Sequence, residues 1–179
     1  MPDPRQPPRS WTSRDPISVN LSRRSIFNSS LYDEIVALVE KYGIEPRLFR
    51  IEVTESSYTE NIDLVISMVT RLQDYGFTVL MDDFGSGYSS FNAFSDIPVD
   101  ILKADMVFMR NLERNPRVAS VFTSIVNMAH SLGIPVIAEG VETQEQYEFL
   151  HSVGCDYAQG YYCARPMDPD AFEAHVDGR

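Results

Sequence analysis

The chain has 179 residues, a formal net charge of −11, 44% hydrophobic residues and 23% charged residues. This length and composition are typical of one globular domain with its own hydrophobic core. A nucleic acid polymer is excluded as the expected partner, because an acidic protein without a visible basic patch repels a polyanion.

Residues 1–16 differ in composition from the rest of the chain. They hold five of the eleven prolines, mixed with arginines. Such a segment cannot form a helix or a central strand. We therefore predict a disordered, Pro/Arg-rich arm over residues 1–16 and a folded domain over residues 17–179. A second interpretation is that the arm is foreign to the domain.

Cysteine usage and hydropathy indicate a cellular compartment. The two cysteines, Cys155 and Cys163, show neither a pairing pattern nor metal-ligand spacing, which is typical of reduced thiols. No apolar run approaches the roughly 18 residues that a membrane-spanning helix needs, and no secretory signal is visible. We expect a cytoplasmic protein without a membrane segment.

From Ile17 onward, short apolar strands alternate with amphipathic helices. Six strands are predicted, at Ile17–Asn20, Phe49–Thr54, Thr78–Asp82, Ile101–Asp105, Pro135–Glu139 and Ala158–Tyr162. Helices are predicted at Leu31–Tyr42 and Ile62–Tyr75, after Asn115-Pro116, from Thr143 and after Asp168-Pro169. Ser30 and Gly43 suit the two ends of the first helix, and Thr143 with Gln146 suits a capping box.

The alternation of strands and helices predicts an α/β fold with a parallel sheet. An open doubly wound sheet is one option, but nothing resembles its glycine-rich phosphate loop. An incomplete TIM-like (β/α) barrel of about six parallel strands with outer helices fits better. Polar residues recur at the C-terminal ends of the strands, where barrel active sites are built.

These polar residues form the candidate site. In chain order they are Asn20, Glu52, Glu55, Asp82, Asp83, Lys103, Asp105, Glu139, Glu142 and Gln159. If the strands are parallel, the side chains converge on one rim, and so many carboxylates would repel one another or protonate. Hard divalent cations remove this conflict, and oxygen ligands suit Mg²⁺ or Mn²⁺.

Each residue also has an ordinary structural interpretation. An aspartate at a strand end is most often a helix cap, Glu142 could belong only to the start of the Thr143 helix, and Lys103 could simply pair with Asp105. Gln159 could satisfy a backbone group. The joint pattern over six successive strands favours a metal site over these separate explanations.

The sequence resembles the EAL domains, the bacterial cyclic-di-GMP phosphodiesterases. The motifs that carry the resemblance are ISVNLS, IEVTES, MDDFGSGYSS, ILKAD, IAEGVET and GCDYAQGYYCARP, which occur in the family's order and spacing from about Ile17 to Met167. The resemblance implies a modified (β/α)8 barrel. It also implies metal-dependent hydrolysis of cyclic di-GMP to linear pGpG, with two Mg²⁺ or Mn²⁺ ions in the intact site.

The resemblance also implies a role for each residue. Asn20, Glu52 and Asp82 match the ligands of a first metal. Asp82, Asp83 and Glu139 match those of a second. Lys103 matches the lysine that contacts the attacking water or the phosphate, with Asp105 beside it. Glu55 matches the glutamate that tethers the loop after the aspartate pair, and Glu142 and Gln159 match further site residues.

One departure from the family pattern weighs against activity. The chain contains no Glu-Ala-Leu tripeptide, whose glutamate is a metal ligand in the family. The resemblance therefore suggests an EAL domain that lacks its first strands and helices, with impaired hydrolysis. Alternative hypotheses are an inactive module that binds cyclic di-GMP or another protein, or a fragment without function. The open edges of an incomplete barrel also predict self-association.

Overall fold

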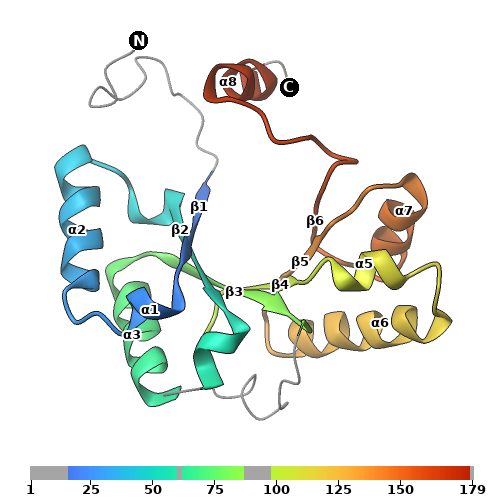
Figure 1. The fold of residues 1–179 in the computed structure, drawn as a ribbon, viewed down its shortest axis with the longest axis horizontal. Coiled ribbons are helices and arrows are strands. Elements are labelled where there is room, and N and C mark those ends of the chain that lie inside the picture. Colours follow the sequence, from blue (N-terminus) through green and yellow to red (C-terminus); the bar gives the residue numbers. More distant parts are fainter. Residues whose placement is uncertain (1–15, 60–61, 87–97, 178–179) are drawn as a thin grey trace.

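The computed structural model describes residues 16–59, 62–86 and 98–177. Within these residues, six strands form one parallel sheet in which each strand lies beside its neighbour in sequence, in the order β1 to β6 (Figure 1). The strands are Ile17–Leu21 (β1), Phe49–Thr54 (β2), Thr78–Phe84 (β3), Ile101–Ala104 (β4), Val136–Glu139 (β5) and Tyr157–Gln159 (β6). The sheet is a half-barrel with outer helices, which confirms the predicted fold class.

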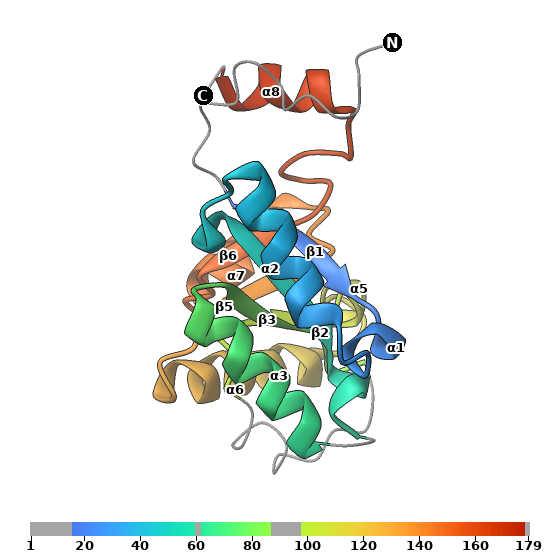
Figure 2. The ribbon, with the colours of Figure 1, turned by 90° about the vertical axis from the view of Figure 1, so that its left-hand side faces the viewer.

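The helices connect successive strands, except for the last one, which follows β6. They are Arg23–Ile26 (α1), Leu31–Tyr42 (α2), Ile62–Tyr75 (α3), Val107–Asn111 (α5), Pro116–Ser131 (α6), Gln144–Ser152 (α7) and Pro169–Asp177 (α8), with short 3₁₀ helices at Pro46–Leu48 (η1) and Glu55–Thr59 (η2). Helix α8 stands apart from the half-barrel in two perpendicular views (Figures 1 and 2). Within the described ranges, no helix has the length and hydropathy to cross a membrane.

Two predicted strands end earlier than expected. Strand β4 stops at Ala104 because the Asp105 carboxylate accepts a hydrogen bond from Val107 N at 2.7 Å and so begins α5, a helix that the sequence did not predict. Strand β6 is Tyr157–Gln159 rather than Ala158–Tyr162, because the chain turns after Gln159. The predicted arm over residues 1–16 lies outside the described residues, except for residue 16.

The two faces of the sheet are different in character. Alternate strand residues such as Ile51, Met81 and Leu102 are buried in one cluster with helix residues such as Val69 and Phe122. This convex face supplies most of the core. The opposite, concave face holds a small separate apolar cluster of Leu80, Ile101 and Ile137. Each member of that cluster is two residues before a charged side chain of the candidate site, so the cluster forms an apolar layer beneath it.

All four predicted caps lie at the observed helix ends, and three of them have the expected capping geometry. Thr143 and Gln146 form a complete capping box, Asn115 accepts a hydrogen bond from Arg117 N, and Gly43 ends α2 in the left-handed conformation. Ser30 occupies the N-cap position of α2 but makes no capping hydrogen bond to the backbone, because its hydroxyl lies against two side-chain acceptors, Asn28 Oδ1 and Glu34 Oε1. The predicted cap position is therefore confirmed, but the Ser30 side chain does not cap the helix.

Two aspartates accept hydrogen bonds from backbone N–H groups near the starts of neighbouring strands. Asp100, just before β4, accepts a hydrogen bond from Val79 N of β3 at 2.7 Å. Asp156, just before β6, accepts one from Val136 N of β5 at 2.8 Å and contacts His130 Nε2 at 2.7 Å. Each carboxylate satisfies a backbone donor at the opposite end of the sheet from the candidate site. These contacts hold adjacent strands in register.

We expect Asp156→Ala to lower the free energy of unfolding by about 1–3 kcal/mol, because it leaves the Val136 N–H without its charged acceptor. Burial by itself raises the pKa of Asp156, but the hydrogen bonds from His130 and Val136 outweigh it and hold that pKa below its usual 3.8. A carboxyl group with a depressed pKa stabilises the fold fully above its unfolded-state pKa, and this contribution is lost as the pH falls from there through the lower folded-state pKa. Urea unfolding should therefore show the difference at pH 7 and a smaller one below about pH 4. A difference that grows on acidification would contradict this assignment.

Candidate active site

Lys103 is the centre of the candidate site. It comes from the middle of β4, and its side chain is 5% exposed. Its Nζ lies 2.9 Å from Glu52 Oε2, 2.8 Å from Asp82 Oδ1 and 2.7 Å from Glu139 Oε1. These carboxylates come from β2, β3 and β5, so one ammonium joins four strands of the sheet. Burial alone would lower the pKa of Lys103, but hydrogen bonds to the three carboxylates raise it above its usual value.

A backbone irregularity brings neighbouring aspartates together. The register between β3 and β4 shifts between Met81 and Phe84, an irregularity of the β-bulge type, and Asp83 has a positive φ of 58°. In a regular strand, adjacent side chains would point to opposite faces. Here carboxylate oxygens of Asp82, Asp83 and Glu139 all lie within 4.8 Å of one another. The bulge therefore places both aspartates at the same site, at the cost of a strained backbone conformation.

The cluster holds more negative than positive charge. Glu52, Asp82, Asp83 and Glu139 surround the single ammonium of Lys103. Burial raises the pKa of Glu139 despite the opposing effect of Lys103, and burial together with the Asp82 charge raises the pKa of Asp83. Both carboxylates therefore ionise less readily than in water, and a further cation would relieve the repulsion. Several carboxylate oxygens at this separation are a suitable donor set for a hard divalent ion.

Glu55 and Asp105 border the cluster. Glu55 is buried, and its Oε2 accepts a hydrogen bond from Gly85 N at 2.9 Å, which holds the segment directly after β3. Burial raises the pKa of Glu55, with smaller contributions from the charges of Asp83 and Asp105. One oxygen of the Asp105 carboxylate accepts a hydrogen bond from Val107 N at the start of α5. Both residues thus have a structural contact as well as a position near the cluster.

The other three predicted site residues lie at the rim without joining the cluster. Asn20 is exposed on β1 in register with Glu52, and Gln159 is exposed on β6 in register with Glu139. Glu142 is exposed just before α7. Within the described ranges, no hydrogen bond or ion pair joins their side chains to Lys103 or to the carboxylates around it. Their proposed roles therefore depend on the resemblance.

Arg50 is a residue of the concave face that the sequence analysis did not single out. It lies two residues before Glu52, so strand alternation places both on the same face. Its Nε is buried, and the structure gives this atom no hydrogen-bond partner among the described residues. Side chains alternate between the two faces of a strand, so the position of Glu52 on the concave face could have identified Arg50, two residues earlier.

Comparison with known proteins identifies the fold and its relatives. A sequence profile of the family described as EAL domain matches residues 6–166. The cyclic di-GMP phosphodiesterase PA2567 of Pseudomonas aeruginosa is 34% identical over 166 residues, which is 91% of this chain and 28% of that protein. The chain thus spans less than a third of that relative's length.

Solved structures of related proteins have a similar fold. The PaMucR phosphodiesterase in complex with c-di-GMP is 33% identical with a TM-score of 0.84, over 88% of this chain and 64% of that one. Klebsiella pneumoniae BlrP1 with manganese and cyclic di-GMP is 29% identical with a TM-score of 0.76, over 82% of this chain and 38% of that one. The extent of the profile match, together with the half-barrel and its similarity to these structures, shows that the chain belongs to the EAL domain family.

Proposed function

We propose that this chain carries the metal- and phosphate-binding rim of a cyclic-di-GMP phosphodiesterase that opens cyclic di-GMP to linear pGpG, with impaired turnover. The observation that carries the proposal is the carboxylate cluster of Asp82, Asp83 and Glu139 around Lys103 at the C-terminal ends of parallel strands. Support also comes from the named phosphodiesterase relative and from relatives solved with cyclic di-GMP.

The residues present fit one or two divalent cations, Mg²⁺ or Mn²⁺. Glu52, Asp82, Asp83 and Glu139 would hold them, with Asn20 at the edge of the site. When bound, such ions lower the pKa of a water and stabilise the attacking and leaving oxygens of an in-line displacement. Lys103 holds the carboxylates of three strands in fixed positions and supplies positive charge where a phosphate would gain negative charge.

An inactive binding module is the second candidate. The sequence contains no Glu-Ala-Leu tripeptide, so the glutamate that the family uses as a metal ligand has no counterpart in that motif. Loss of even a residue that only orients a metal ligand costs ~10–100-fold in affinity or activity. A rim that binds the dinucleotide with little or no hydrolysis is therefore consistent with the same geometry.

One experiment separates these candidates. Cyclic di-GMP is incubated with the protein and Mn²⁺, Mg²⁺ or chelator, and pGpG is quantified by chromatography beside a calorimetric binding titration. We expect metal-dependent binding with slow formation of pGpG, because a net charge of −11 disfavours a dianion unless metal neutralises the rim. Metal-dependent binding without product would support the binding module. Equal binding in chelator would refute the proposed metal-bridged site.

We expect Asp82→Asn to weaken Mn²⁺ binding about 10-fold or more, and Asp105→Asn to weaken it less. Asp82 lies inside the carboxylate cluster and contacts Lys103, whereas one Asp105 oxygen already accepts Val107 N. Both substitutions remove one negative charge and keep the side-chain size, so they are matched. Calorimetry with Mn²⁺ measures the two affinities, and equal losses would contradict the assignment of Asp82 as a shared ligand.

We also expect the chain to self-associate. In the described sheet, β1 pairs only with β2 and β6 only with β5, so both outer strands have an edge without a strand neighbour. Ile17 on β1 and Tyr157 on β6 are 40% and 54% exposed. Such edges tend to pair with another chain. Light scattering during gel filtration should give a mass above 20.3 kDa, and a stable monomer would contradict this expectation.

A further inference from the structure

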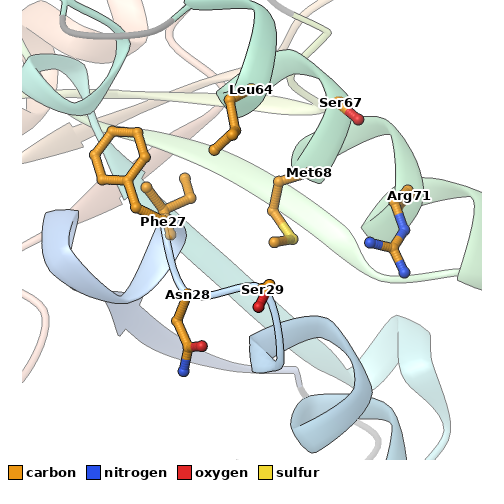
Figure 3. A pocket seen from close by; sticks show the side chains of 8 residues that line it. Phe27, Asn28, Ser29, Leu64, Ser67, Met68 and Arg71 are labelled. Atoms are coloured by element: carbon orange, nitrogen blue, oxygen red, sulfur yellow. The ribbon is translucent and has the colours of Figure 1, made fainter.

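A cavity of about 240 Å³ lies outside the candidate active site, between α3 and the connection from α1 to α2 (Figure 3). Its walls are apolar at one end, where the buried Ile26 lines it together with Phe27, Leu64 and Met68. Leu64, Met68 and Arg71 extend from α3 toward the residues of the α1–α2 connection (Figure 3). The cavity is therefore apolar along one side and carries a single cation at the other end.

Arg71 is held in place by aromatic side chains. Its guanidinium carbon lies 4.0 Å from the centre of the Tyr32 ring. Tyr32 in turn contacts Tyr75 edge to face at 6.4 Å, and the Tyr75 hydroxyl donates to Glu40 at 3.1 Å. A guanidinium stacked in this way keeps its N–H edge free to bind an anion.

Among the described residues, Arg71 has no carboxylate partner that balances its charge. Across the part of the chain that the structure describes, no carboxylate forms an ion pair with Arg71, although the protein carries 26 acidic residues. Arg47, by comparison, pairs with Glu45 at 2.7 Å. The planar guanidinium is shaped to bind a carboxylate in a bidentate manner. The cavity thus combines an unpaired, oriented cation with an adjoining apolar wall.

We propose that this cavity binds a small amphipathic carboxylate, with the carboxylate on Arg71 and a short alkyl chain against Phe27, Leu64 and Met68. The volume is below the roughly 300–1,000 Å³ of pockets for drug-sized ligands, which limits the ligand to about the size of a medium-chain fatty acid. Burial of each additional CH₂ against the apolar wall should strengthen binding about fourfold at most, so affinity should increase with chain length until the cavity is full.

Octanoate is the probe, with octanol and acetate as comparison compounds. Calorimetry or two-dimensional NMR titration should show that octanoate binds more tightly than either. Octanol lacks the charge for Arg71, and acetate lacks the alkyl chain. Changes in NMR signals should be concentrated at the α1–α2 connection and α3. Equal binding of octanol would overturn the role of Arg71, and absence of octanoate binding at millimolar concentrations would overturn the proposal.

Three variants test the location. Arg71→Gln should weaken octanoate binding about tenfold or more, because it removes a charged hydrogen-bond donor. Arg117→Gln, which removes the same charge from an exposed position on α6, should leave binding unchanged. Ser29→Phe keeps Arg71 but fills the cavity, so it should also abolish binding. Retained binding in both Arg71→Gln and Ser29→Phe would place the ligand elsewhere and refute the site.

Discussion

Replacement of Lys103 by methionine is expected to lower the free energy of unfolding by about 3–5 kcal/mol in metal-free buffer, the loss typical of removing one partner from a buried ion pair. Methionine has a similar length, so the change removes the charge with little change in packing. Three carboxylates, from Glu52, Asp82 and Glu139, would then be left without the ammonium that now contacts each of them. Urea unfolding in the presence of chelator measures the loss.

Lys41→Met is the matched control, because Lys41 is exposed on α2 and lies over the Tyr42 ring at 5.1 Å. It should change stability by no more than about 0.5 kcal/mol. Addition of Mn²⁺ should restore part of the stability of Lys103→Met, since a divalent cation neutralises the same carboxylates. A Lys103→Met protein within about 1 kcal/mol of the parent would show that the three contacts contribute little to the fold.

The second large effect is expected for Gly160→Ala, with a loss of about 2–3 kcal/mol from overpacking. A Cβ at Gly160 would lie 2.2 Å from Val141 O and 2.3 Å from Val141 N. Both are backbone atoms that already make hydrogen bonds. Val141 O accepts one from Tyr162 N at 2.9 Å, and Val141 N donates one to Gln159 O at 3.1 Å. Either the alanine displaces this hydrogen-bonded turn or the end of β6 moves away from β5.

Gly154→Ala separates the steric effect from backbone strain. Gly154 has a positive φ of 75°, but an added Cβ would meet no atom within 4 Å. Its replacement should cost only the left-handed strain, about 1 kcal/mol. Thermal and urea unfolding of the two variants give the comparison. If Gly160→Ala is no less stable than Gly154→Ala, the close approach to Val141 is not a constraint on the native structure.

The order of the elements was predictable from local pattern. Short apolar runs located all six strands, and helical periodicity located the longer helices between them. Strand β2 and helices α2 and α3 have the predicted bounds. These elements depend on residues near one another in sequence, which is why periodicity identifies them. The faces of the helices were less predictable. Leu38 and Tyr42 belong to the apolar face of α2 but are 54% and 48% exposed. The apolar face of a helix can be wider than the area that the sheet covers, and the sequence does not show how much is covered.

The sequence by itself determined that Glu52, Asp82, Lys103 and Glu139 stand at or near strand ends, and parallel strands then require them to meet at one rim. Only the tertiary structure decided how they meet. The bulge that turns Asp83 toward Asp82 depends on the register between β3 and β4, and the three contacts of Lys103 depend on the curvature of four strands. Register and curvature are set by packing between residues that are distant in the chain, so no local pattern contains them.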